Sequence, residues 1–290
     1  MNAQYLGFSS AIISAIIMGC FGVLVRYVSV DCSIIAFVRF GLGFSLLAVY
    51  LLLSKRWQTF RVGFSVPLFL SGVLLAFCVL FYSQAIKTTS LANAVFLLYL
   101  APLLASILGY CFLKETISAV KALLVLSAFA GTLCLLEFDF SIGKTVTSGQ
   151  ISALVAALCY AFFMIANRKI APAISGFSRA FYQLLTGTLV LLPFVGSIDL
   201  QSLYQDRYGL LAIGFFQGFV ALTLAILALR YLETYEYATV SYLEPIVAAI
   251  AGYLIYHESL SWLQGVGCAL ILGSGFMQIR FSIKGSAGED

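Results

Sequence analysis

The stretch "LYLAPLLASILGYCFLKET" occupies Leu98–Thr116, and a second copy, "SYLEPIVAAIAGYLIYHES", occupies Ser241–Ser259. Counted from Tyr99 and Tyr242, which are 143 positions apart, nine of twenty residues are identical, among them proline, glycine, tyrosine and glutamate. An apolar composition alone would match leucine, isoleucine and alanine by chance, but it would not keep these four residue types in register. The chain therefore contains one unit twice.

The composition around these copies is that of an integral membrane protein. Of the 290 residues, 62% are hydrophobic and only 10% are charged, whereas an ordinary soluble domain carries about 25% charged residues. Apolar runs such as Leu6–Val28 are unbroken and long enough for a helix to cross a bilayer. Strands of a membrane barrel would instead alternate apolar and polar residues. We therefore predict an all-α protein embedded in a lipid bilayer.

Polar breaks divide the chain into about ten apolar segments. We expect spans near 6–28, 33–54, 64–86, 91–112, 119–136, 148–170, 177–197, 207–230, 236–256 and 262–281. Ten spans give five for each copy, so the predicted domains are 1–143, the first five-helix repeat, and 144–290, the second.

The positive residues predict the orientation of the chain. One set of connections and tails carries eleven lysines and arginines, and the opposite set carries four. Positive residues collect on the cytoplasmic side, so we expect both termini there, in a multi-pass protein of the cell (inner) membrane. Because five is an odd number, the second repeat enters the membrane inverted relative to the first. Inverted repeats around a central binding site are typical of alternating-access transporters.

The doubled Pro…Gly-Tyr…Glu phrase, the "VRF" of Val38–Phe40 and the five spans per half resemble a known family. The chain is similar, over essentially its whole length, to the EamA-type ten-helix permeases of the drug/metabolite transporter superfamily. The resemblance implies two inverted five-helix repeats around a central cavity that moves small organic solutes. It does not choose the solute, since members carry amino acids, other metabolites, quaternary amines and drugs.

Two charged residues inside predicted spans are the first candidates for a binding site. Glu244 stands where the other copy has Ala101, and Arg39 corresponds in the repeat to Gln183. A charge within a span costs at least a few kcal/mol and usually faces a cavity. The alternative for both residues is a side chain that extends along the helix to the membrane surface. We predict that both bind substrate.

Aromatic and amide residues complete the predicted site. Aromatic rings around an acid suit an amine, although at 15% aromatic residues most rings serve packing; amides could instead hydrogen-bond between helices. The predicted substrate-binding residues are Glu244, Arg39, Tyr99, Tyr242, Gln183, Tyr82, Asn93 and Gln217, with Tyr160, Phe163 and Tyr182 as further aromatic residues within spans. Pro102 and Pro245 each remove a backbone donor and are predicted to kink their helices.

Small residues predict close helix packing. Gly109 and Gly252 follow alanines at four-residue spacing, and the last span carries Gly265, Gly267, Gly273 and Gly275. Such faces let membrane helices approach closely. The contact could lie within the chain or with a second protomer, so both a monomer and a homodimer stay open.

The predicted function is secondary transport of a small-molecule substrate. An amino acid or related zwitterion would use Arg39 and Glu244 as opposite poles. The alternative is a proton-coupled antiporter of amines or lipophilic and quaternary cations, which would use Glu244 and an aromatic cage. The direction of transport and the coupling to protons stay open.

Other classes of function lack their motifs in this sequence. The only histidine is His257, the seven cysteines form no CxxC, and no GxxxxGK[ST] occurs, so we predict neither an enzyme nor a bound metal or cofactor. No basic patch with interleaved aromatic residues indicates nucleic acid. A channel would need rings of carbonyls or charges, which an unpaired Glu244 does not supply.

Overall fold

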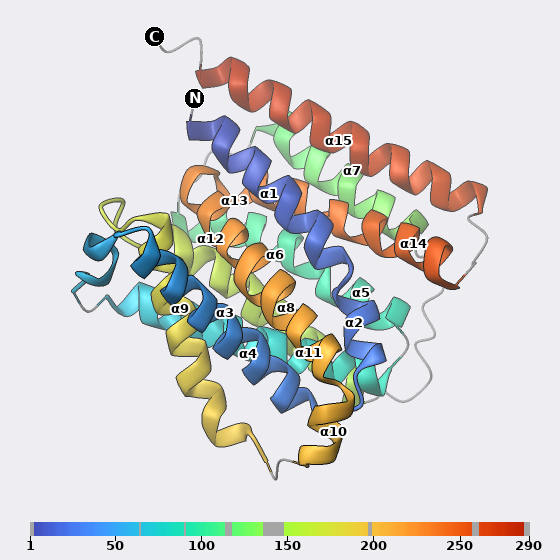
Figure 1. Ribbon diagram of the computed structural model, residues 1–290. Helices are drawn as coiled ribbons and strands as arrows, with labels where there is room; N and C mark the ends of the chain where they lie inside the picture. The colour runs from blue at the N-terminus through green and yellow to red at the C-terminus, as the bar shows by residue number, and fades with distance from the viewer. Residues whose placement is uncertain are drawn as a thin grey trace.

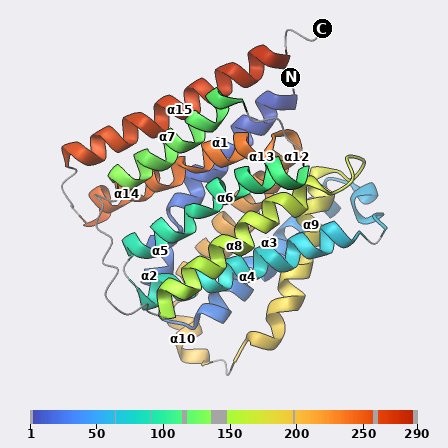
Figure 2. The same cartoon turned by 180° about the vertical axis from the view of Figure 1, so that it is seen from behind.

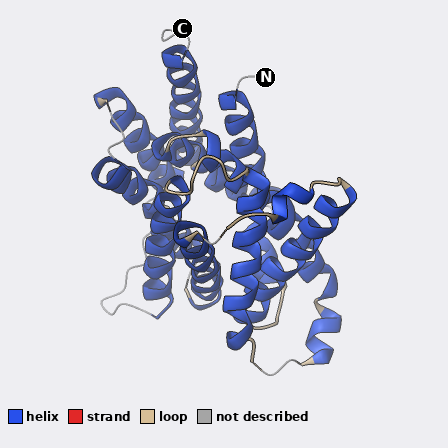
Figure 3. Ribbon diagram, turned by 90° about the vertical axis from the view of Figure 1, so that its left-hand side faces the viewer, coloured by secondary structure: helices blue, strands red, loops and turns tan. Residues whose placement is uncertain are grey.

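The computed structural model describes residues 3–63, 65–89, 91–113, 118–135, 148–196, 199–256 and 261–286. Within these ranges every regular element is a helix (Figure 3). The elements group into ten helical segments, in agreement with the ten predicted apolar runs.

Five segments belong to each half of the chain. The first half contains α1 (Ala3–Gly19) with α2 (Phe21–Tyr27), α3 (Cys32–Leu53), α4 (Val66–Thr88), α5 (Leu91–Leu98) with α6 (Leu100–Leu108) and η2 (Gly109–Leu113), and α7 (Ala119–Leu135). The second half contains α8 (Ser148–Arg168), α9 (Gly176–Leu191) with η3 (Leu192–Phe194), α11 (Arg207–Ala212) with η4 (Ile213–Ala221) and α12 (Leu222–Tyr231), α13 (Thr234–Ser241) with α14 (Leu243–Tyr256), and α15 (Trp262–Ser286). The short helices η1 (Trp57–Phe60) and α10 (Leu200–Gln205) lie in connections.

Length and composition support the membrane assignment. Five stretches of described helix are long and apolar enough to cross a bilayer, namely Gln4–Tyr27, Cys32–Leu53, Val66–Thr88, Ser148–Arg168 and Arg207–Tyr231. Three shorter helices are also apolar: Leu100–Leu113, Ala122–Cys134 and Trp262–Met277. The predicted limits 33–54 and 148–170 fall within two residues of the helices observed there.

The two halves pack in a reciprocal pattern. The third segment of the first half, α4, packs against α8 and α9, and the third segment of the second half, η4 with α12, packs against α1 and α3. The last segments of the halves, α7 and α15, lie side by side (Figure 1). The first segments, α1 and α8, run in opposite directions, as the two views show (Figures 1 and 2). The third segment of each half thus contacts the first and second segments of the other half, as expected for two copies of one unit. The predicted boundary between residues 143 and 144 lies outside the described residues.

The two copies of the repeated phrase are interrupted helices. Tyr99 separates α5 from α6, and Tyr242 separates α13 from α14, in each case three residues before a proline, Pro102 or Pro245. A proline inside a helix cannot donate its backbone hydrogen bond and disturbs the preceding turn. The Tyr242 hydroxyl donates to the backbone oxygen of Tyr99 at 3.1 Å, so the two interruptions lie against each other. The N-terminal end of α14 therefore begins inside the helical bundle.

Close packing of small residues fixes α3 against η4. A Cβ added at Gly43 would lie 2.7 Å from the backbone carbon of Gly218, and a Cβ added at Gly218 would overlap the backbone oxygen of Arg39. Small residues allow such approach between membrane helices. The contact holds the Arg39 backbone at a fixed position in the bundle.

Gly218→Ala is therefore expected to lower the free energy of unfolding by about 1–3 kcal/mol, because overpacking at a backbone contact forces the two helices apart. Thermal unfolding in detergent measures the change. The matched control is Gly273→Ala on α15, where an added Cβ meets nothing within 4 Å. Equal stability of the Gly218→Ala variant and wild type would contradict the close contact.

The glycines of the last segment differ in what they contact within the described chain. The backbone oxygen of Gly267 lies 2.8 Å from a Cβ built at Gly131 of α7, so this position does serve the contact between α7 and α15. An added Cβ at Gly265, Gly273 or Gly275 would meet nothing within 4 Å. These three glycines make no close contact with another helix of the described chain, so packing at these positions against a second protomer stays a prediction.

Candidate functional site

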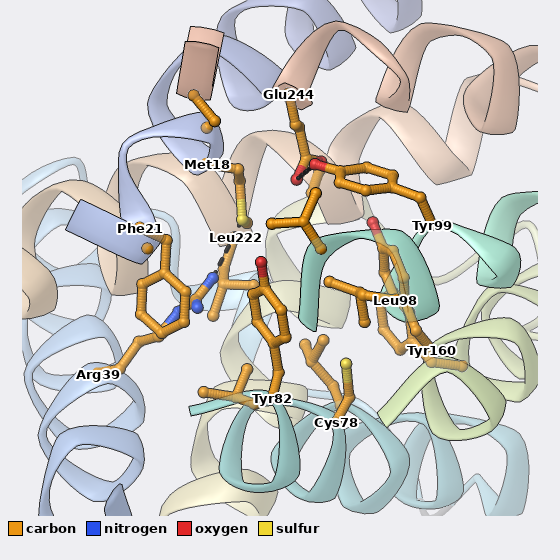
Figure 4. Close-up of a pocket in the computed structure, with 18 of the residues that line it drawn as sticks. Met18, Phe21, Arg39, Cys78, Tyr82, Leu98, Tyr99, Tyr160, Leu222 and Glu244 are labelled. Atoms are coloured by element: carbon orange, nitrogen blue, oxygen red, sulfur yellow. Dashed lines mark hydrogen bonds between the residues drawn. The ribbon is translucent and has the colours of Figure 1, made fainter. Parts of the chain in front are cut away.

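A cavity lies between the two halves, inside the bundle. It is lined from the first half by α1, α2, α3, α4 and α5 and from the second by α8, α12, α13 and α14. Its described lining includes Met18, Phe21, Arg39, Cys78, Tyr82, Leu98, Tyr99, Tyr160, Phe163, Leu222, Tyr237 and Glu244 (Figure 4). Four of the predicted substrate-binding residues, Glu244, Arg39, Tyr99 and Tyr82, thus meet in one cavity.

Glu244 enters the cavity from the first turn of α14. A carboxylate near a helix N-terminus is favoured by the helix dipole, and the interruption at Tyr242 places this terminus inside the bundle rather than at its surface. One carboxylate oxygen, Oε2, accepts a hydrogen bond from the Tyr99 hydroxyl at 3.1 Å. The first half has no equivalent charge, since Ala101 occupies the corresponding position and is fully buried. The duplicated helix break therefore carries an acid on one side only.

Arg39 is a buried cation with weak partners. Its side chain is 3% exposed, and it lies on α3 next to the contact with η4. The guanidinium donates to the sulfur of Met18 at 3.0 Å and lies over the Phe21 ring, 4.3 Å from the ring centre. The Arg39 Nε atom has no hydrogen-bond partner. Arg39 therefore lines the cavity and is not extended to the membrane surface. No carboxylate of the described residues lies within ion-pair distance of it, although Glu244 in the same cavity attracts its charge.

Aromatic rings form much of the remaining wall. Tyr82 stacks with Phe21 at 6.0 Å between ring centres, and Tyr160 stacks with Phe163 at 6.0 Å. The Tyr160 and Tyr237 hydroxyls lie 3.2 Å apart and share a hydrogen bond. The space in front of the two charged residues is thus lined by aromatic rings and a few hydroxyl groups.

Sequence reasoning missed several wall residues. Cys78 precedes Tyr82 by four residues on α4, a spacing that would have placed it on the cavity face once Tyr82 was chosen. Tyr237 lies on α13, before the interruption at Tyr242, so regular helical spacing from Glu244 on α14 does not predict its position. Met18 and Phe21 carry no such signal, because apolar residues fill the whole of the first segment.

The other predicted residues lie elsewhere. Tyr242 is fully buried beside Tyr99 and donates to its backbone. Gln183 donates to Ser71 at 2.7 Å, and Gln217 donates to the backbone oxygen of Ile17 at 2.6 Å. These three are not among the described residues that line the cavity, and both glutamines join helices of different halves. Asn93 lies on α5, but its side chain is outside the described part of the structure.

Polar contacts join the two halves at one end of the bundle. At the end remote from the chain termini, Asp206 accepts hydrogen bonds from the backbone and hydroxyl of Ser29, both at 2.7 Å, and from the backbone of Val30 at 3.1 Å. The Lys87 ammonium donates to the backbone oxygen of Val30. Burial raises the pKa of Asp206, but these hydrogen bonds and the Lys87 charge outweigh it, so the pKa lies below its ordinary value.

The contact at Asp206 should be lost in acid. Because folding lowers the pKa of Asp206, its ionised form stabilises the folded protein at pH values above the ordinary aspartate pKa of about 4. This stabilisation is lost as the pH falls through the lowered pKa. Asp206→Asn is expected to lower the free energy of unfolding by about 1–2 kcal/mol at pH 7, and the difference from wild type should shrink below about pH 4. Thermal unfolding in detergent across this range measures both; a difference independent of pH would contradict the ionised contact.

Comparison with known proteins identifies the family. The EamA-like transporter family matches residues 5–137 and again 147–279. An uncharacterized transporter of Archaeoglobus fulgidus is 28% identical over 267 residues, which cover 92% of this chain and 93% of that protein. The S-adenosylmethionine uptake transporter of Rickettsia bellii is 24% identical over 189 residues, 65% of this chain and 64% of its own.

A solved crystal structure of a protein has the same fold. It matches with a TM-score of 0.75 over 94% of this chain and 95% of that chain, at 19% identity. The family matches cover both halves of the chain, and the described helices have the length and composition of membrane spans. The chain therefore belongs to the EamA-like transporter family, and it is a membrane transporter rather than an enzyme.

Proposed function

We propose that the protein is a secondary transporter that carries small zwitterionic metabolites, amino acids or related compounds, by alternating access. One observation carries the proposal: Arg39 and Glu244 face the same cavity from different halves, and no ion pair joins them (Figure 4). The two charges attract each other across the cavity without contact, which leaves both free to bind groups of opposite sign. A zwitterion offers both groups on one small molecule.

Arg39 is suited to the carboxylate of such a substrate. Its planar guanidinium presents donors that match a carboxylate in a two-pronged geometry. Its observed partners, the Met18 sulfur and the Phe21 ring, carry no negative charge. A buried charge without an opposite partner costs several kcal/mol. Binding an anionic group would offset that cost, which a purely structural role would leave unexplained.

Glu244 is suited to the amine. Of its two carboxylate oxygens, Oε2 is held by Tyr99, and Oε1 accepts no hydrogen bond from the described residues. The rings of Tyr82, Tyr99 and Tyr160 line the same space. An ammonium beside the carboxylate would also contact ring faces, and cation–π contacts add about 0.5–2 kcal/mol.

The helix interruptions supply a basis for alternating access. Helices broken near the middle of the membrane, at the interface between repeats, are typical of transporter binding sites. Movement of one repeat against the other, 1–143 against 144–290, would open the cavity first to one side and then to the other. The contacts of Asp206 with Ser29 and Val30 would separate in one of these states. We place both termini in the cytoplasm and the protein in the cell (inner) membrane, from the distribution of lysine and arginine.

The relative from Rickettsia bellii is consistent with a zwitterionic substrate, because S-adenosylmethionine carries an amino-acid group. A second candidate is proton-coupled antiport of amines or lipophilic cations, which the Tyr99–Glu244 contact and the neighbouring rings favour. The guanidinium of Arg39 in the same cavity would repel such a cation, and we therefore rank this function second.

Uptake into proteoliposomes tests the proposal. The panel should hold amino acids, the corresponding amines without a carboxylate and the corresponding acids without an amine, each with and without a pH gradient. We expect saturable transport of compounds that carry both groups. Transport of amines alone, driven by the pH gradient, would establish the second candidate instead, and no transport of any zwitterion would contradict the proposal.

A further inference from the structure

A second pocket opens at the end of the bundle that holds the chain termini. It lies between the α3–α4 connection of the first half and the start of α9 and end of α12 of the second. Four cations line it: Lys55, Arg56, Arg61 and Arg230. The described lining contains no aspartate or glutamate. The sequence predicts that this end faces the cytoplasm.

Most of the donors of these cations are unused. The Arg56 guanidinium lies over the Phe177 ring at 4.8 Å, and Arg230 makes one long hydrogen bond, 3.4 Å, to the backbone of Pro172. Lys55 and Arg61 form no side-chain hydrogen bond or ion pair with the described residues. Four clustered positive charges without counter-charges repel each other, so an anionic ligand would stabilise them.

A buried arginine close by shows the contrast. Arg179 donates to the backbone oxygens of Asn167, Ile170, Ala171 and Ile174, which end α8 and begin the following connection. Its donors are therefore used in holding the α8–α9 turn. The four pocket cations have no comparable structural task.

The backbone conformation of Lys55 is a further reason to assign a function to its charge. The turn that ends α3 has hydrogen bonds from the Arg56 backbone to Leu51 at 3.0 Å and from the Lys55 backbone to Leu52 at 3.1 Å. This pattern is the Schellman motif, whose left-handed position is usually glycine. Lys55 occupies that position with a φ of 55°. A side chain there is less stable than glycine, so a lysine at this position carries a local conformational cost.

The rim of the pocket points to a membrane lipid. Leu53, Trp57 and Val66 flank the cations and are 79%, 58% and 63% exposed. Tryptophan is enriched where membrane helices meet the headgroups. Basic pockets between membrane helices on the cytoplasmic side can bind anionic headgroups. We propose that this pocket binds the phosphate group of an anionic phospholipid, with the acyl chains along the exposed apolar residues.

Lipid retention measured on the whole purified protein tests the proposal. Native mass spectrometry in detergent would compare phosphatidylglycerol with phosphatidylcholine, and glycerol 3-phosphate would be added as a soluble competitor. The test variant is Lys55→Gly with Arg61→Gln. Each positive charge near the lipid contributes about fivefold in affinity, so the variant, which lacks two, should bind phosphatidylglycerol roughly 25-fold more weakly than wild type.

Two controls separate the pocket from other effects. Arg26→Gln with Arg207→Gln removes the same number of charges at the opposite end of the bundle and should leave lipid binding unchanged. Because glycine suits the turn at position 55, the test variant should keep the unfolding temperature of wild type. Lipid loss without loss of folding would then establish the pocket.

Three results would overturn the proposal. Wild type could bind phosphatidylcholine as tightly as phosphatidylglycerol, or the control variant could lose as much phosphatidylglycerol binding as the test variant. The third is a test variant that binds phosphatidylglycerol as tightly as wild type. Displacement of the lipid by glycerol 3-phosphate at equal concentration would assign the pocket to a soluble phosphate ester instead. No transport is measured, so failure of this proposal is distinct from failure of the proposed function.

Discussion

Replacing Arg39 with glutamine is expected to reduce the affinity for a zwitterionic substrate by about 30- to 150-fold, which corresponds to about 2–3 kcal/mol for charge-assisted hydrogen bonds. The guanidinium is buried in the cavity wall and has only the Met18 sulfur and the Phe21 ring beside it. The substrate carboxylate would be its one anionic partner. Uptake of a labelled amino acid into proteoliposomes, over a range of concentrations, measures the loss.

The stability of the same variant gives an independent readout. Removal of a buried cation without an anionic partner should leave the unfolding temperature unchanged or raise it, because the cost of burying the charge disappears. Arg39→Lys keeps the charge without the planar fork and should lie between wild type and glutamine in affinity. A glutamine variant that unfolds early and transports normally would show that Arg39 holds the structure and does not bind substrate.

Replacing Glu244 with glutamine is expected to have a comparable effect, about 10- to 100-fold, through the other pole of the substrate. The amide oxygen can still accept the hydrogen bond from Tyr99, so the geometry of the wall is kept while the charge is removed. If a proton on Glu244 couples transport to the pH gradient, the variant should also lose its response to that gradient. Uptake with and without a pH gradient measures both effects.

Tyr99→Phe is the matched control for Glu244. It keeps the aromatic ring beside the carboxylate and removes only the hydroxyl that donates to it. A neutral hydrogen-bond donor at this site should change affinity by less than about tenfold. Wild-type transport by Glu244→Gln under every gradient would remove Glu244 from the site.

Much of the architecture was predictable from the repeated phrase and from the apolar runs. The doubled phrase marks the two repeats, and Pro102 and Pro245 stand three residues after the observed helix interruptions at Tyr99 and Tyr242. The ten apolar runs correspond to the ten helical segments. Which glycines of α15 contact another helix of the same chain was not predictable, because glycine at regular spacing looks the same whether or not it faces a neighbour.

The charged residues of the site were predictable from the sequence, and the neutral polar ones were less so. Arg39 and Glu244 stand out because a membrane span tolerates few charges, and Tyr99 and Tyr82 accompany them in the cavity. Gln183 and Gln217 are equally polar by sequence, yet their amides hydrogen-bond to Ser71 and to Ile17 across the interface between halves. An amide can be satisfied by one donor or acceptor on a neighbouring helix, and no residue pattern along the chain shows where that neighbour lies.

The most direct test of the two-pole site is a comparison of ligands in wild type and Arg39→Gln. Binding of an amino acid and of the amine that lacks its carboxylate would be measured by calorimetry on purified protein. If Arg39 holds the carboxylate, wild type prefers the amino acid by about tenfold or more, and Arg39→Gln loses that preference while still binding the amine. Wild type that binds the amine as tightly as the amino acid would contradict the zwitterion site.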